Sequence, residues 1–586
     1  MTELLEPMDS YDPRLARDAS GPFAELNAAG VLSAADVHVA EALGRLCREP
    51  SPESVLAAAL TVRATRTGSV CLDLQDVASA LPDHPWPEPG AWLAAVGAST
   101  LVAEQVLRLE GRLIYLDRYW QAEGSVVDDL RRRRDLPAPA VDEQRLAEAL
   151  DALFPDPTYA EQRQAADDTV RRRTSVITGG PGTGKTTTLA RVLAALAHLH
   201  GSADGGSRLR VALAAPTGKA AARMSQAIAQ AAEHPDFPAE HRAAIAGLTA
   251  TTLHRLLGTR PDNGTRFTHH RGNRLVHDVV VVDEVSMVSL TLMARLLEAV
   301  RPEARLVLVG DPDQLASVEA GAVLRDLVDG LAGSDSPVSQ LRTVHRFGSG
   351  IGALAAAVRA GDAAETLRVL EQAPPGVEWI DTEARVREVV EDHAVALMRA
   401  ASESEDAAIL TALEQHRLLC AHREGPYGVT HWNRQIERWL MEHTGRDWLE
   451  HRYAGQPLLV TTNDYGLRLW NGDTGVVTAT RPGPDGVAFA RALFADGSAA
   501  GRSVPLSRLA DVETAHAMTV HRAQGSQFRE VTVVLPPHDS PLATRELFYT
   551  ALTRAQETVR VVGDPAAVEA AVTGRVRRAT GLAQRL

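Results

Sequence analysis

The segment Gly179–Thr186, GGPGTGKT, has the residue types and spacing needed to bind a triphosphate. It follows the β-branched run SVIT and opens the helical pattern KTTTLARVLAALAHLHG. Glycines let main-chain N–H groups wrap around phosphates, and the helix N-terminus adds partial positive charge. A glycine-rich turn that merely opens a helix is the alternative, but the complete match favours phosphate binding. The predicted nucleotide contacts are Gly179, Gly180, Pro181, Gly182, Thr183, Gly184, Lys185, Thr186 and Thr187.

Two carboxylates at the end of another apolar run could supply the rest of a hydrolysis reaction. Asp283 follows VVVV and is predicted to hold Mg²⁺ together with Thr186, while Glu284 is the natural base for an attacking water. An Asp-Glu pair can also cap a helix, but its place downstream of a phosphate loop favours catalysis. Gln314, in GDPDQL, is a candidate sensor of the γ-phosphate; otherwise it is a turn residue after Pro312.

Lysine is used at only two positions, Lys185 in the phosphate loop and Lys219 in PTGKAAARM, although the chain has 61 lysines and arginines. The general preference for arginine is typical of a GC-rich genome. A compact ammonium fits between phosphates where the planar fork of arginine would be too broad. We therefore interpret both lysines as chemical requirements, with an accident of codon usage as the alternative for Lys219.

The length of 586 residues predicts three or four domains, and the 45% hydrophobic content is that of a globular protein. The polar start MTELLEPMDSYDPRLARD indicates neither a signal nor a transit peptide, and no run is apolar enough for a membrane span, so we expect a cytoplasmic protein without membrane contact. Three distant cysteines imply no disulfide framework. The net charge of −14 argues against a passive nucleic-acid coat, but allows a narrow basic channel.

The elements that must position these residues form an α/β protein. Residues 1–135 show short helical patterns without chemical motifs and predict a mostly helical N-terminal domain, followed by a linker in RRRRDLPAPAVDEQ. Strand–helix alternation then predicts two tandem domains with parallel sheets covered by helices on both faces, over 136–340 and 341–586. A hairpin near 262–277 interrupts the first, and a small β-barrel near 452–511 interrupts the second.

The ordered motifs resemble superfamily 1 helicases: EQRQAA, GGPGTGKT, APTGKAAARM, TLHRLLG, VVDEVSM, GDPDQLASV, VHRFG, MTVHRAQGSQF and YTALTRA. Within that superfamily the sequence most resembles RecD, the alpha chain of exodeoxyribonuclease V (RecBCD), through LLCAHREGPYGVTHWNRQIE and LRLWNGDTGVV. The resemblance is strong over about residues 150–565. It implies tandem RecA-like domains and an SH3-like fold for the inserted barrel.

The resemblance also implies roles for individual residues around ATP. Gln162 matches the glutamine that reads the adenine edge, and Arg346 and Arg554 match arginines that reach across the domain cleft to the γ-phosphate. A bidentate guanidinium suits phosphate oxygens whose charge grows in the transition state. Gln527 stands where the superfamily usually has a glutamate that contacts the ribose, so nucleotide selectivity is in doubt there.

For nucleic acid, the resemblance implies a single strand held through its phosphates by polar residues at strand ends. His254 and His521, taken alone, would be read as structural histidines. The implied DNA contacts are Pro216, Thr217, Lys219, Thr252, His254, Thr519, His521, Gln524 and Ser526.

The resemblance therefore implies an ATP- and Mg²⁺-dependent DNA helicase with 5′→3′ translocation. It would act on single-stranded and double-stranded DNA ends as one chain of a heterotrimer with RecB-like and RecC-like partners, onto which residues 1–135 would dock. No nuclease constellation is visible outside the ATP motifs. Two alternatives stay open: a stand-alone helicase of DNA or RNA, and a structural subunit that only binds nucleotide.

Overall fold

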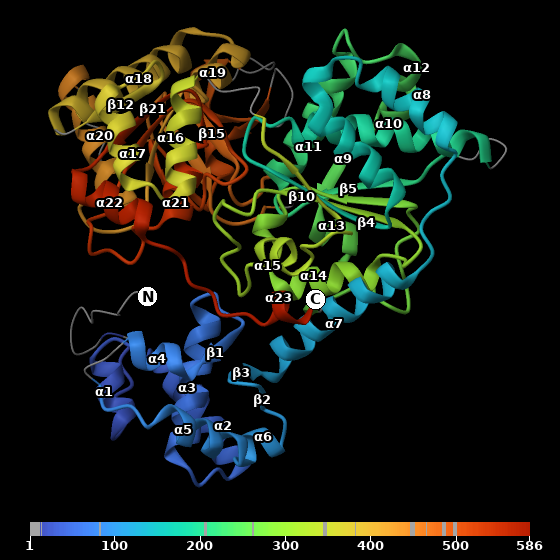
Figure 1. Ribbon diagram of the computed structural model, residues 1–586. Helices are drawn as coiled ribbons and strands as arrows, with labels where there is room; N and C mark the ends of the chain where they lie inside the picture. The colour runs from blue at the N-terminus through green and yellow to red at the C-terminus, as the bar shows by residue number, and fades with distance from the viewer. Residues whose placement is uncertain are drawn as a thin grey trace.

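The computed structural model describes residues 12–586 apart from 13, 81–83, 204–207, 261–262, 344–348, 381–382, 446–451, 465, 483–487 and 496–500. Three parts are visible in Figure 1: an N-terminal domain in blue, a first α/β domain from cyan to green, and a second from yellow to red. Arg346, predicted to reach the γ-phosphate, lies outside the described residues.

The N-terminal domain is mostly helical, as the sequence predicts. A three-stranded antiparallel sheet, β1-β3-β2, completes it and was not predicted, because its strands span only three or four residues each. The elements are α1 (Pro22–Ala28), α2 (Ala34–Cys47), α3 (Pro52–Arg66), β1 (Cys71–Asp73), α4 (Leu74–Ala80), α5 (Pro89–Gly97), α6 (Thr100–Ala103), β2 (Leu107–Glu110) and β3 (Leu113–Leu116).

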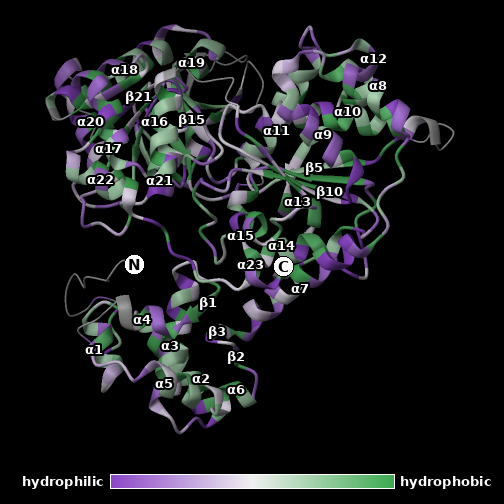
Figure 2. Ribbon diagram, in the orientation of Figure 1, coloured by the Kyte–Doolittle hydropathy of each residue, from purple (hydrophilic) through white to green (hydrophobic). Residues whose placement is uncertain are grey.

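The first α/β domain has a six-stranded parallel sheet in the order β11-β4-β10-β9-β5-β6. Its central strands β9 and β10 read as continuous apolar runs because both faces are covered. Figure 2 shows β5 and β10 in the colour of hydrophobic residues, between helices of mixed character. The strands are β4 (Thr174–Gly179), β5 (Val211–Ala215), β6 (Ala250–Thr252), β9 (Val279–Val282), β10 (Arg305–Gly310) and β11 (Val338–Leu341).

Alternate residues of the run Val279–Val282 enter opposite helical layers. Val279 and Val281 pack with one layer, and Val280 and Val282 with the other. The first layer is α8 (Glu143–Leu153), α9 (Ala160–Arg171), α10 (Lys185–Ala203), α11 (Gly218–Glu233) and α12 (Ala239–Ile245). The second is α7 (Asp117–Asp135), α13 (Leu253–Leu257), α14 (Leu290–Ala299), α15 (Val323–Gly330) and α23 (Leu582–Arg585).

The second α/β domain repeats this plan with a five-stranded parallel sheet in the order β12-β21-β20-β13-β19. Helices again cover both faces, which confirms the predicted fold class. Its elements are α16 (Ser349–Ala360), α17 (Ala363–Gln372), β12 (Val377–Ile380), α18 (Glu383–Glu403), α19 (Asp406–Leu413), β13 (His416–Cys420), α20 (Val429–Thr444), β19 (Ala517–Thr519), β20 (Phe528–Val534), α21 (Arg545–Leu552), β21 (Ala555–Val562) and α22 (Pro565–Thr573).

Two antiparallel segments interrupt these domains. In the first domain, β7 (Thr259–Arg260) pairs with β8 (Asn263–Phe267). In the second, a five-stranded meander runs in the order β17-β16-β15-β14-β18 before the chain returns to β19. The closed SH3-like barrel stays a prediction. The meander consists of β14 (Pro457–Val460), β15 (Thr474–Pro482), β16 (Ala488–Phe494), β17 (Arg502–Pro505) and β18 (Val512–Thr514).

The predicted linker is wrong in its first part, because RRRR is the end of α7, which packs against α14. Arg133 is 3% exposed, and its guanidinium donates to the carbonyl oxygens of Arg301 and Ala304 at 2.8 and 2.6 Å. Main-chain acceptors compensate for the burial of its charge, although burial still lowers its pKa to about 10. The charge run therefore joins the N-terminal domain to the first α/β domain.

The last residues leave the second domain and return to the other two, which the sequence did not predict. Figure 1 shows this C-terminal tail in red, running from the second domain to α7, α14 and α15. The main-chain N–H of Val70 donates to Ala579 O at 2.8 Å, and Arg578 donates to Gly321 O at 3.0 Å. Leu582 is fully buried in the core of the first domain. Among the described helices, none is both long and apolar enough to span a bilayer.

Candidate nucleotide site and the surfaces around it

The phosphate loop joins β4 to α10 at the carboxyl edge of the first sheet. Gly182 and Gly184 have φ of 80° and 82°, a region that favours glycine. The amine of Lys185 lies inside the loop and donates to the carbonyl oxygens of Gly179 and Gly180 at 2.6 and 3.0 Å. Because this ammonium already points into the ring of main-chain groups, the loop has the geometry of a phosphate cradle.

Asp283 and Glu284 follow β9 at the same edge. Burial and the adjacent Glu284 raise the pKa of Asp283, and Lys185 acts in the opposite direction. Glu284 is a non-glycine residue in the left-handed region, with φ of 53°, which turns the chain sharply after the strand. The structure therefore brings together the lysine and the two carboxylates that the sequence singled out.

A chain of hydrogen bonds crosses the cleft between the two α/β domains at the end of β10. Arg554 of the second domain donates to Gln314 Oε1 at 3.0 Å, and Gln314 Nε2 donates to Asp311 at 3.1 Å. Tyr549 on α21 donates its hydroxyl to the same Asp311 oxygen at 3.2 Å. Burial lowers the pKa of Arg554, and nearby Glu284 opposes this shift. Gln314 and Arg554 thus meet directly.

The neighbouring residue, Leu315, is held by its main chain from the second domain. Its N–H donates to Thr550 Oγ1 at 2.8 Å, and its carbonyl accepts from Gln524 at 2.9 Å. Ser526 lies in the same joint, where its carbonyl accepts from Arg554 at 3.3 Å. Gln524 and Ser526 are both buried, and of the two Gln524 contacts the loop after β10, whereas Ser526 contacts Arg554 of its own domain.

Two further residues predicted near ATP have different surroundings. Gln162 is buried on α9 and donates to Thr183 O at 3.2 Å, so it touches the phosphate loop. Gln527 accepts from Gln556 at its side chain and from Arg223 at its main chain, contacts that join it to β21 and α11. The ribose role of Gln527 stays a prediction.

Most predicted DNA contacts lie at the carboxyl edges of the sheets. Thr252 ends β6, which pairs in parallel with β5, so it lies at the same edge as Pro216 and Thr217. The remaining predicted contacts that are at least partly exposed are Lys219, His254, Thr519 and His521. The hydroxyls of Thr217 and Thr252 each accept from a main-chain N–H at 3.2 Å and so begin α11 and α13.

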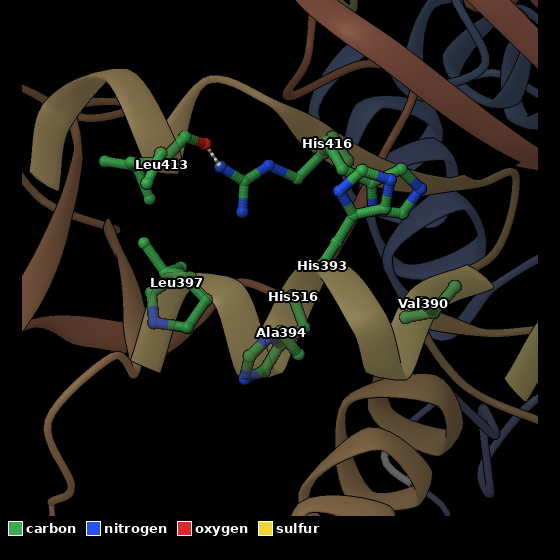
Figure 3. Close-up of a pocket in the computed structure, with 10 residues that line it drawn as sticks. Val390, His393, Ala394, Leu397, Leu413, His416 and His516 are labelled. Atoms are coloured by element: carbon green, nitrogen blue, oxygen red, sulfur yellow. Dashed lines mark hydrogen bonds between the residues drawn. The ribbon is translucent and has the colours of Figure 1, made fainter. Parts of the chain in front are cut away.

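Lys219 lies where the first domain, the second sheet and the inserted meander meet. Its amine is 5.9 Å from the ring centre of Phe528 and 3.5 Å from Thr474 Oγ1. On the same ring lies the guanidinium of Arg417, at 5.0 Å. Arg417 lines a cavity of the second domain, which Figure 3 shows with His393, His416 and His516 around it. Burial lowers the pKa of all three histidines, so the positive charge there belongs to Arg417.

Three family models match the chain. Residues 162–320 match an AAA domain, and residues 514–562 match the UvrD-like helicase C-terminal domain. Residues 28–115 match the N-terminal domain of the RecBCD enzyme subunit RecD.

The RecBCD enzyme subunit RecD of Mycolicibacterium smegmatis is 55% identical, over 95% of this chain and 98% of that protein. The subunit of the same name from Mycobacterium tuberculosis H37Rv is 52% identical, over 99% of both chains. The chain belongs to the RecD family. A crystal structure of Bacteroides Pif1 bound to single-stranded DNA is 16% identical, covers 68% of this chain and 91% of its own, and has a TM-score of 0.36.

The donor set of this RecD-family chain fits Mg²⁺. Thr186 offers a hydroxyl oxygen and Asp283 a carboxylate, which are ligands that Mg²⁺ prefers. Asp283 lies beside Glu284, so a cation bound there would compensate two adjacent negative charges. Within the described part of the chain, no three His, Cys, Asp or Glu residues gather as a metal cage. Few protein ligands are usual for Mg²⁺ that is shared with a nucleotide.

Sequence reasoning missed three residues of the cleft in this RecD-family chain, Asp311, Tyr549 and Thr550. Tyr549 and Thr550 lie inside the motif YTALTRA, and Asp311 inside GDPDQLASV, so the motifs contained them. The motifs do not show that these residues meet across the two domains. A Cβ atom on Gly180 would lie 2.9 Å from the Tyr549 hydroxyl, so the second domain approaches the phosphate loop itself.

Proposed function

We propose that this chain is an ATP-driven DNA helicase motor, the RecD-type subunit of a RecBCD-type complex that processes double-strand DNA ends for recombinational repair. The carrying observation is the cleft in which Arg554, Gln314 and Asp311 join one domain to the other. An arginine from one domain beside the phosphate loop of the other links nucleotide state to domain closure. A protein that only binds nucleotide needs no such link.

Within this proposal, Lys185 binds the β- and γ-phosphates and Glu284 accepts a proton from the attacking water. Thr186 and Asp283 would hold Mg²⁺, which when bound would neutralise charge at the phosphates. Gln314 senses the γ-phosphate, and Arg554 and Arg346 stabilise the charge that develops on it. Gln162 orients the adenine, and Gln527 lies toward the ribose. Hydrolysis ends the attraction between these arginines and the γ-phosphate, so the cleft reopens.

The DNA side of the proposal is a single strand that runs over the carboxyl edges of both sheets. Its phosphates contact Thr217, Thr252 and Thr519 with no base-specific hydrogen bonds. Pro216, Lys219, His254 and His521 complete this surface, while Gln524 and Ser526 transmit strand binding to the cleft loop. Alternating grip during opening and closing then gives stepping, with 5′→3′ direction by family resemblance.

The proposed partners are RecB-like and RecC-like chains, onto which the N-terminal domain docks. The near-complete mutual coverage with the mycobacterial RecD subunits supports this assembly over a stand-alone helicase of DNA or RNA. Purification separates the two: co-purification with two large chains supports the complex, and an active lone monomer supports the alternative.

The decisive experiment substitutes Lys185→Gln and measures DNA-stimulated ATP hydrolysis. We expect a loss of about 100-fold or more, because an amide cannot supply the charge at the phosphates. The thermal unfolding midpoint should stay close to that of the unsubstituted protein, which excludes misfolding as the cause. Hydrolysis at the original rate in this variant would contradict the assignment of this loop. If the unsubstituted protein binds ATP without DNA-stimulated hydrolysis, the non-catalytic alternative would be supported.

A further inference from the structure

Trp470 on the inserted meander is placed against the first domain. A Cβ atom on Gly218, the residue that opens α11, would lie 3.2 Å from Cδ1 of the Trp470 ring. The indole is carried by a tight turn between β14 and β15, in which the Trp470 N–H donates to Asp473 Oδ2 at 2.8 Å. Gly472, with φ of 94°, completes the turn. A rigid turn thus holds one large aromatic ring over a glycine of PTGK.

Trp470 differs from the other tryptophans of the described chain. Trp92, Trp432 and Trp439 are buried within hydrophobic clusters. Trp86, Trp120 and Trp379 pack against such clusters. Among the described residues, Trp470 alone belongs to no cluster and is only partly buried, although its own meander has a core of its own. Trp470 instead packs where the meander meets Gly218 of the first domain.

The residue that follows Gly218 in the chain is the cation Lys219. Within the described residues, no Asp or Glu lies within ion-pair distance of the Lys219 amine, whose contacts are Thr474 and the Phe528 ring. The surrounding protein and the charges of Arg223 and Arg417 lower the pKa of Lys219. A partly buried amine with this environment gains stability when an anion such as a phosphate comes close.

The geometry points to a base-stacking subsite: Trp470 stacks on a nucleobase of single-stranded DNA while Lys219 and the start of α11 hold the adjoining phosphate. The inference deepens the proposed function and rests on it. Base–aromatic stacking tolerates every sequence, since each base has a π-face, and so suits a translocating motor. The ring rests on Gly218, which leaves room for it because glycine has no Cβ. A base entering the site would lift the ring from this glycine.

The test compares Trp470→Leu with Trp470→Phe in the full chain, purified with its partner chains if they are needed for solubility. Leucine keeps an apolar contact with Gly218 but has no π-face, whereas phenylalanine keeps both. We expect the Kd for single-stranded oligo-dT to rise by about 5- to 100-fold with Trp470→Leu and by less than about threefold with Trp470→Phe. Thermal unfolding of each variant monitors the fold.

A second measurement does not depend on any variant being folded. Oligo-dT containing 5-iododeoxyuridine is irradiated with the unsubstituted protein, and the peptide that carries the cross-link is identified by mass spectrometry. An adduct on Trp470 is expected. Equal affinity of Trp470→Leu, or adducts only on other aromatic residues, would overturn the subsite and leave the motor proposal standing. If the unsubstituted protein binds no single-stranded DNA at all, the proposed function itself is wrong.

Discussion

Two loops of the first domain, built alike, carry the only two lysines of the chain. Each follows a strand of the same sheet and opens a long helix: β4 precedes Lys185, and β5 precedes Lys219. Each is approached by one aromatic side chain of the second domain at a glycine, Gly180 by the hydroxyl of Tyr549 and Gly218 by the ring of Trp470. The second domain therefore contacts both loops at once.

The two loops differ in what surrounds the amine. Lys185 donates to carbonyl oxygens of its own loop and is held ready inside a main-chain ring. Lys219 points out of its loop toward Phe528 and the meander. The first arrangement is fixed by local backbone, and the second exists only because separate domains meet. We therefore expect ATP hydrolysis to be lost when Lys185 is substituted. We expect DNA binding at Lys219 to depend on pH.

The largest effect is expected at Lys185, when the Lys→Arg substitution is made in each loop separately and the two variants are compared. Lys185→Arg should lower DNA-stimulated kcat by about 100-fold or more, because the planar guanidinium is broader than the ammonium that fits the ring. Lys219→Arg should lower it by less than about tenfold, because this amine lies between domains and is not enclosed by a main-chain ring. Steady-state ATPase assays at saturating DNA measure both. Equal losses in the two variants would remove the distinction between the loops.

The contact at Gly180 gives the next effect. Gly180→Ala places a methyl group 2.9 Å from the buried Tyr549 hydroxyl, so cleft closure should be strained and kcat should fall by about tenfold. Adding Tyr549→Phe removes the hydroxyl and should restore part of the loss, although it also removes the hydrogen bond to Asp311. A double variant no better than Gly180→Ala would show that the hydroxyl is not what the methyl group meets.

The smallest effect is a pH dependence at Lys219. Its pKa is lowered to about 7 by burial and by Arg223 and Arg417, while Glu414 and Asp473 oppose the shift. A bound phosphate would raise this pKa, so DNA binding takes up a proton above pH 7 and affinity falls as pH rises, by at most about tenfold per pH unit. Fluorescence anisotropy between pH 7 and 9 measures it. Lys219→Arg, which stays charged, should flatten the profile; an unchanged profile would contradict the role of Lys219.

Local features of the site could be predicted from the sequence because they depend on neighbours in the chain. The glycines of the phosphate loop and the carboxylates after a valine run indicate a parallel-sheet edge. The contact between Arg554 and Gln314 was not predicted, because the two residues are far apart in the sequence. Tyr549 beside Gly180 could not be predicted, since the two residues approach only after both domains have folded.

Contacts between residues far apart in the sequence also explain the wrong predictions outside the site. A run of four arginines reads as solvated, yet Arg133 is buried because distant carbonyl oxygens accept its hydrogen bonds. Short strands such as Cys71–Asp73 have too few residues for a periodic pattern. The final residues carry no motif at all, so no signal indicated that they leave the second domain.

That C-terminal tail sets the range over which the cleft can open. Gly574 is anchored to the second domain, where its carbonyl accepts from Arg545, and Arg578 is anchored to Gly321 of the first. The four Cα–Cα steps from Gly574 to Arg578 span at most about 14 Å when fully extended, and the Arg578 side chain bridges the remaining distance to Gly321. The tail therefore limits how far the two α/β domains can separate on this side. The two domains cannot part on this side of the cleft without first detaching the tail from the first domain.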